Sequence, residues 1–158
     1  MKKVKKDVTF LKNYLTDFSN LVKPNNDIVN KLIEVRNIFL NTSKKKGKMM
    51  VCGNGGSAAI ASHVSVDLTK NAKIRTINFN ESDLITCFSN DYGYERWIEK
   101  AVDFYADKND TLVLISSSGK SKNMINACKA AKRKKIKVIS FTGHMKNNPL
   151  SKVADLSL

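Results

Sequence analysis

Cysteine, proline and acidic residues are scarce in this sequence. Its 158 residues include three cysteines, two prolines and seven glycines. The cysteines, Cys52, Cys87 and Cys128, are odd in number, widely spaced and set in apolar segments. Nothing in their spacing resembles a zinc knuckle, and the pattern predicts buried free thiols. Internal repeats and low-complexity linkers are also missing, so the sequence gives no support for a second globular domain.

Long apolar runs are missing as well. No stretch approaches the roughly 20 apolar residues that a membrane-spanning helix needs. The N-terminus, Met-Lys-Lys-Val-Lys-Lys, leads into Asp7 and an amphipathic pattern rather than into the apolar core of a signal peptide. We therefore expect a cytoplasmic protein with no membrane partner.

The few acidic residues leave a strong positive charge. Fourteen Asp and Glu stand against 28 Lys and Arg, which gives a net charge of +14. The basic residues gather at the N-terminus, at 44–46 and at 132–135, where they suit helix C-termini and solvent. No signature of a nucleic-acid-binding module accompanies them. The pattern favours a solvated basic surface over a nucleic-acid partner.

The hydrophobic period changes near residue 49. Before it, apolar residues at helical spacing predict two helices, one ending before Pro24 and one over about 27–43. After it, short apolar runs alternate with helical stretches, which is typical of an α/β fold. Strands are predicted near 49–52, 74–77, 111–115, 136–140 and 155–158, and helices near 57–69, 82–89, 95–106 and 121–134.

These elements predict a three-layer α/β sandwich around a five-stranded, mainly parallel sheet. We expect residues 1–46 to form a helical hairpin that packs on the same domain or on a neighbouring subunit, and residues 47–158 to form the sheet domain. Ligands of such sheets bind outside the carboxyl ends of the strands.

Two strand-to-helix junctions at that edge are rich in small residues, at 49–57 and 112–121. Backbone N–H groups and hydroxyls gather there at a helix N-terminus, which suits an anion. Gly53, Gly55 and Ala58 fit a dinucleotide fingerprint, but the acidic residue expected near 76–79 is missing. Ser118-Gly119-Lys120-Ser121 resembles the end of a P-loop, but Leu114 replaces its first glycine. No nucleotide cofactor is therefore expected.

Three polar groups remain as candidates for a site. Four serines surround Gly119, more than capping of one helix needs, and Lys120 adds positive charge. His63 and Asp67 are four residues apart on one helix face, where they form either a proton-transfer or metal-binding pair or a local hydrogen-bonded pair. Residues 89–94 either lie over the same edge or form a turn.

The segments 53–58, 90–95, 115–121 and 141–143 resemble, in order and spacing, the sugar isomerase (SIS) domain of phosphoheptose isomerases. The resemblance covers about residues 49–158, and the N-terminal helices fit the family's helical lead-in. It implies an SIS/flavodoxin-like fold, a homotetramer and a phosphosugar-binding domain. It also implies aldose–ketose isomerisation of sedoheptulose 7-phosphate through an enediol, in lipopolysaccharide heptose synthesis.

The resemblance also assigns site residues. It implies that the sugar phosphate is held by Ser116, Ser117, Ser118 and Ser121. It implies that the sugar is lined by Asn54, Gly55, Ser57, Asn90 and Asp91. His63 falls where the family has a metal-contacting histidine, and Asp67 where it has a catalytic glutamate, so zinc is the cofactor to expect. The alternative is a catalytically impaired phosphosugar-binding or assembly module, because the family's C-terminal helix with its glutamine and histidine has no counterpart up to Leu158.

Overall fold

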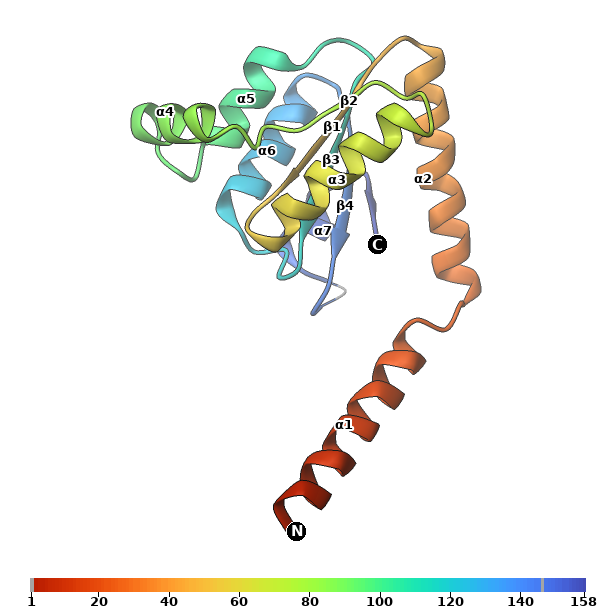
Figure 1. Cartoon of the computed structure of the whole chain (residues 1–158). Coiled ribbons are helices and arrows are strands. Elements are labelled where there is room, and N and C mark those ends of the chain that lie inside the picture. The colour runs from red at the N-terminus through yellow and green to blue at the C-terminus, as the bar shows by residue number, and fades with distance from the viewer. Residues whose placement is uncertain (1, 146) are drawn as a thin grey trace. The chain divides into compact units, whose positions relative to one another are not determined.

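The computed structural model describes residues 2–145 and 147–158 (Figure 1). The chain divides into two compact units, Met1–Asn30 and Lys31–Leu158. The first unit holds helix α1 (Lys2–Leu21), which ends before Pro24 as predicted, and the start of α2 (Asn26–Lys44). Asn25 caps α2, because its Oδ1 accepts a hydrogen bond of 3.0 Å from the Ile28 N–H. In the described part of the chain, no helix has both the length and the apolar character needed to cross a membrane.

The second unit is built on a parallel sheet with the strand order β2-β1-β3-β4-β5. This confirms the predicted five-stranded sheet, although the two edge strands have only two residues each. The strands are β1 (Met49–Gly53), β2 (Thr76–Ile77), β3 (Thr111–Ser116), β4 (Lys137–Thr142) and β5 (Leu156–Ser157). The helices after α2 are α3 (Gly56–Lys70), α4 (Ser82–Tyr92), α5 (Trp97–Tyr105), α6 (Lys122–Arg133) and α7 (Pro149–Val153).

Helices cover both faces of the sheet, as the three-layer prediction requires. Successive strand side chains point to opposite faces. Met50, Leu112 and Val138 therefore pack on one side with residues of α5, α6 and α7. Met49 and Val113 pack on the other side with α2 and α3. Because the central strands are buried on both faces, they appear in the sequence as continuous apolar runs.

Three features of the fold differ from the prediction. The short helix α7 was not expected, and Asn148 starts it by accepting a hydrogen bond of 2.8 Å from the Ser151 N–H. Helix α4 continues to Tyr92, so Asn90 and Asp91 are helical rather than part of a turn, which begins only at Gly93. Cys52 and Cys128 are buried as expected, but Cys87 is exposed and lies on α4, in which no described residue is buried.

A buried carboxylate joins α5 to α6. Glu99 is 8% exposed, and its two oxygens accept bonds from Arg96 Nε at 3.1 Å and from Arg133 at 2.9 Å. Burial raises the pKa of Glu99, but the two guanidinium groups outweigh it and hold the pKa below its usual value. The folded state therefore favours ionised Glu99. This contribution to stability is fully present above the pKa that Glu99 has in the unfolded chain. It is lost as the pH falls through the lower pKa that Glu99 has in the folded protein.

We therefore expect Glu99→Gln to lower the free energy of unfolding at pH 7 by about 1 kcal/mol. The difference from wild type should start to shrink as the pH falls below 4.5, the usual pKa, and vanish below the lower pKa of folded Glu99, where wild-type Glu99 is protonated too. Urea unfolding at a series of pH values measures it. Glu95→Gln is the control, because the Glu95 side chain is 57% exposed. An equal loss in both variants at every pH would contradict the assignment.

Candidate active site

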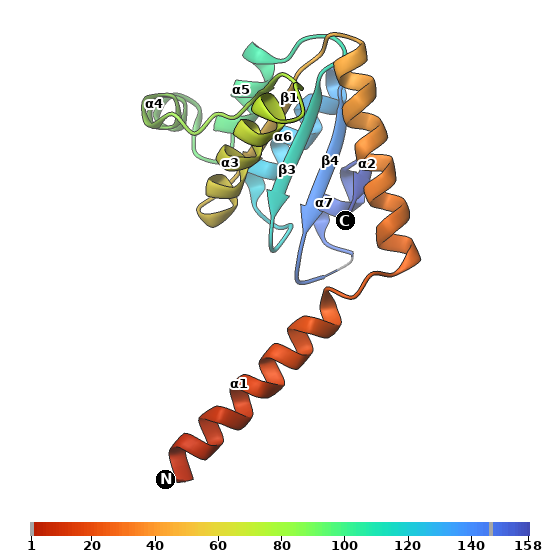
Figure 2. The same ribbon diagram turned by 45° about the vertical axis from the view of Figure 1, so that its right-hand side comes forward.

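The candidate site lies at the carboxyl edge of the sheet, where β1, β3 and β4 end. Because β1 pairs with β3 and β3 with β4 in parallel, the loops that follow these strands meet at one edge. Figure 2 shows β3 and β4 running side by side toward it. We call residues 116–121, which follow β3 and lead into α6, the serine loop.

Burial divides the serines of the serine loop into two kinds. Ser116 is 6% exposed, and its Oγ accepts a bond of 3.2 Å from the Gly119 N–H. Ser117 is exposed, while Ser118 and Ser121 are half-buried. Ser121 holds the N-cap position of α6, yet among the described residues its side chain makes no capping bond. Ser116 thus shapes the loop, and the other three hydroxyls lie at the surface beside a helix N-terminus.

A buried asparagine supports the serine loop from behind. Asn148 is 1% exposed, and its side-chain amide donates to Thr142 Oγ1 at 2.9 Å and to the Met145 carbonyl at 2.8 Å. Gly119 has a φ of 60°, and a Cβ at this position would collide with the Asn148 side chain. The Leu150 N–H donates to the Gly119 carbonyl at 3.0 Å. The loop's shape is therefore set by α7 as well as by its own residues.

The loop after β1 brings Asn54 to the same edge. A Cβ on Gly53 would collide with the backbone of Ser57, so the tight junction of β1 and α3 needs glycine there. Gly55 has a φ of 54° and precedes the first turn of α3. Asn54 and Asn123 exchange two amide hydrogen bonds, of 3.0 and 2.9 Å. Because Asn123 is buried, this pair fixes the orientation of the Asn54 amide.

The segment after α4 reaches this site through Tyr94. The Tyr94 hydroxyl donates to Asn54 Oδ1 at 3.3 Å. Asn90 and Asp91 are exposed and bond to each other at 2.9 Å, so in this structure they do not join Asn54 or the serine loop. Asp91 also lies near Cys87, and its negative charge raises the pKa of that thiol.

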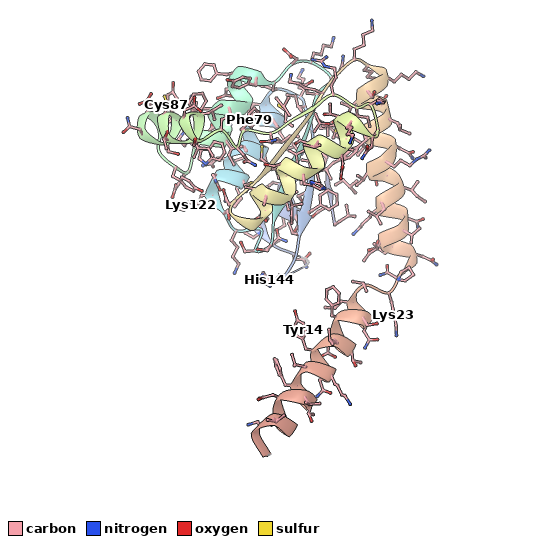
Figure 3. The ribbon with its side chains drawn as sticks, viewed as in Figure 1. Tyr14, Lys23, Phe79, Cys87, Lys122 and His144 are labelled. Carbon is pink, nitrogen blue, oxygen red and sulfur yellow. The ribbon has the colours of Figure 1, made fainter. Side chains whose placement is uncertain are left out.

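Lysines flank the entrance to α6. Lys122 pairs with Glu95 at 2.8 Å, and this carboxylate raises the pKa of the Lys122 ammonium. Lys120 is exposed within the serine loop, where its backbone N–H donates to Ser118 Oγ at 3.2 Å. In Figure 3, Lys122 and His144 lie toward the same side of the second unit. Lys122 is thus paired with a carboxylate, and Lys120 places a positive charge within the serine loop itself, where it suits an anion.

His63 and Asp67 form a surface pair on α3. His63 Nε2 lies 3.5 Å from Asp67 Oδ2, and the two side chains are 79% and 52% exposed. Helix α3 starts at the carboxyl edge and runs back along the sheet. Asp67 therefore lies about 16 Å further along the helix axis than Gly56. The structure confirms that the two residues share a face, but it does not bring them to the serine loop of the same chain.

The described residues do not by themselves form a zinc site. A protein zinc site uses at least three side-chain ligands. His63 and Asp67 supply two, and the described part of the chain holds no group of three or more His, Cys, Asp or Glu residues placed to share a metal.

Comparison with known proteins identifies the class. Residues 10–143 match the family model described as the SIS domain, so the chain belongs to the SIS domain family. Within that family, it is similar to proteins named phosphoheptose isomerase. It is 32% identical to the one from Aliarcobacter butzleri over 94% of this chain and 81% of that protein. It is 40% identical to the one from Histophilus somni over 72% of this chain, and the match spans only 61% of that protein.

Solved structures agree with this assignment. A phosphoheptose isomerase from Neisseria gonorrhoeae superposes with a TM-score of 0.80 at 26% identity, over 100% of this chain and 84% of that one. A phosphoheptose isomerase from Francisella tularensis gives a TM-score of 0.85 over 99% of this chain and 84% of that one, and at 24% identity it supports the fold alone.

Three residues of the site were not predicted from the sequence: Asn123, Tyr94 and Asn148. Asn123 offered a signal, because it follows Ser121 by two positions in the first turn of α6. Tyr94 lay within the polar segment 89–94, but nothing in its spacing distinguished it from Asn90 and Asp91. Asn148 gave no signal, because its role depends on how β4 and α7 turn back onto the serine loop.

Proposed function

We propose that this protein is a phosphosugar isomerase of the phosphoheptose isomerase type, which interconverts sedoheptulose 7-phosphate and an aldose 7-phosphate. The main support for this proposal is the structure of the serine loop. It presents three surface hydroxyls at the N-terminus of α6, in a chain of the SIS domain family.

In this proposal the serine loop binds the phosphate group. The hydroxyls of Ser117, Ser118 and Ser121 donate hydrogen bonds to the phosphate oxygens, and the partial positive charge of the α6 N-terminus adds to them. Ser116 keeps the loop in shape through its bond to Gly119. The serine loop binds only the phosphate end of the substrate. The sugar chain then lies toward Asn54.

Asn54 then orients the sugar. One amide hydrogen and one lone pair of Asn54 are used by Asn123, and Tyr94 shares the same Oδ1. The remaining amide hydrogen is the group that a sugar oxygen meets. Because both partners hold Asn54 in one orientation, little side-chain entropy is lost on binding. Gly55 and Ser57 line the same loop.

The chemistry is a proton transfer between neighbouring carbons. Asp67 acts as general base and removes the proton from the carbon next to the carbonyl, while an acid protonates the carbonyl oxygen, which gives an enediol. Return of the proton to the other carbon and loss of the hydroxyl proton complete the isomerisation without a net oxidant. His63, 3.5 Å from Asp67, is the polar partner of the base.

We further infer that the base and the phosphate site come from different copies of the chain. His63 and Asp67 lie far along α3 from the edge of their own serine loop and are well exposed. Ile60 and Val66 on the same helix are 53% and 56% exposed, which suits an apolar contact with another copy. A homotetramer, zinc, a cytoplasmic location and a role in lipopolysaccharide heptose synthesis remain predictions from the family resemblance.

Ser118→Ala tests the phosphate site. We expect it to weaken binding of sedoheptulose 7-phosphate about tenfold, the cost of one hydrogen bond to a charged group. Thermal stabilisation of the protein over a range of ligand concentrations measures the affinity. Ser82→Ala is the control, because Ser82 is exposed and lies in the first turn of α4. Unchanged binding in Ser118→Ala would remove the serine loop as the phosphate site.

A further inference from the structure

A cavity separate from the candidate active site lies at the opposite, amino edge of the sheet. Its volume is about 520 Å³, and it is formed by the C-terminal part of α2, the turn between α5 and β3 and the turn between α6 and β4. Thr111 and Lys137 line it at the first positions of β3 and β4. The serine loop follows the last residue of β3, so this cavity is distinct from the candidate active site. Five lysines line it: Lys45, Lys108, Lys134, Lys135 and Lys137.

The carboxylate that lines this cavity, Asp110, is paired with a lysine on its buried side. Asp110 Oδ2 accepts from Lys48 Nζ at 2.6 Å and from the Asp107 N–H at 2.8 Å, while its Oδ1 accepts from the Lys48 N–H at 2.8 Å. Its side chain is 1% exposed. Lys48, which is buried, holds Asp110 from behind and also bonds to the exposed Asp107 at 2.7 Å, so two carboxylates share this one lysine. The five cavity lysines still outnumber the single negative charge that remains.

The cavity lysines are left without close partners of opposite charge. Within the described residues, none of the five forms a salt bridge with a carboxylate. Lys134 and Lys137 act on Asp107 and Asp155 only through longer-range attraction. The partial negative charge of a helix C-terminus explains a lysine at the end of α2 and another at the end of α6. They do not account for the lysines at the start of β4 and in the turn before β3, which line the same cavity.

We propose that this cavity binds a small polyanion that carries at least two phosphate groups. Its volume is that of a small-molecule site. A cleft lined by one sign of charge concentrates ions of the other sign, and a single phosphate would engage only some of the five ammonium groups. Asn41 and Asn109 add amide donors at the rim. The cavity holds a ligand of nucleotide size, whereas a nucleic-acid duplex is bound along a row of phosphates.

Tripolyphosphate is the probe for this site. Binding is measured by calorimetry on the whole chain carrying Ser118→Glu, which places a negative charge in the serine loop and closes that competing site. We expect the added pair Lys134→Gln and Lys137→Gln to weaken binding about tenfold, because two of the five ammonium groups that converge on the same anion are lost. The control pair, Lys129→Gln and Lys152→Gln, removes the same charge from exposed positions on α6 and α7. It should change affinity less than about twofold.

Equal weakening by both pairs would show attraction to overall charge and would overturn the proposal. Displacement of the probe by a short DNA duplex that binds more tightly would also overturn it, in favour of nucleic acid. A second measurement needs no variant: acetylation of wild-type lysines, read by mass spectrometry with and without the probe. Protection of Lys45, Lys108 and Lys134 but not of Lys129 supports the cavity site, and uniform labelling contradicts it.

Discussion

Asp67→Asn should lower turnover of sedoheptulose 7-phosphate about a thousandfold, because asparagine keeps the size of the side chain but cannot accept the substrate proton. Binding of the sugar phosphate should stay within about twofold of wild type, since Asp67 does not belong to the serine loop. Isomerase rates and ligand-induced stabilisation measure the two effects separately. Asp83→Asn is the control, because Asp83 is an exposed carboxylate in the first turn of α4.

Mixing two inactive variants tests where Asp67 acts. If the base and the phosphate loop come from different copies, Asp67→Asn and Ser118→Glu chains that are unfolded and refolded together should regain activity. Random assembly gives about a quarter of the sites both wild-type residues. Absence of any recovery in a mixed oligomer would contradict the shared site. Full activity in Asp67→Asn alone would remove this carboxylate as the base.

Gly119→Ala should destabilise the fold by about 2–4 kcal/mol and abolish phosphate binding. The φ of 60° disfavours any side chain at this position, and the new Cβ would collide with Asn148, whose amide is fixed by Thr142 and the Met145 carbonyl. Urea unfolding measures the loss of stability, and calorimetry with the sugar phosphate measures binding.

Gly56→Ala is the matched control for that change. Gly56 is the first residue of α3, and nothing lies within 4 Å of where its Cβ would be. Alanine favours a helix over glycine, so we expect unchanged or slightly raised stability. If both substitutions cost the same, the close approach of Asn148 to Gly119 is not what shapes the serine loop.

The parts of the fold that follow from local patterns were predictable from the sequence. The run 112–115 indicated a buried strand because it has no polar residue, and β3 confirms it. The small residues after β1 and β3 indicated where the loops turn. Helix α7 was not predictable, because it has only five residues and is held by Asn148 and by packing on α6.

The candidate site was predictable in composition but not in geometry. The spacing of four between His63 and Asp67 placed them on one face, and the structure confirms that pairing. Residue spacing within one helix does not determine the distance to a loop that follows another strand. The separation of His63 and Asp67 from the serine loop therefore could not be predicted. In the same way, four serines in six residues looked equivalent in the sequence, whereas burial gives Ser116 a structural role.

The most direct test of the proposed function is NMR of sedoheptulose 7-phosphate incubated with the wild-type chain in deuterated water, with and without added zinc. Isomerisation through an enediol predicts the appearance of the aldose 7-phosphate and deuterium on the carbon that exchanges its proton. Thermal stabilisation by the same ligand, with neither aldose nor deuterium incorporation under either condition, would contradict it. The protein would then be a phosphosugar-binding module without isomerase activity.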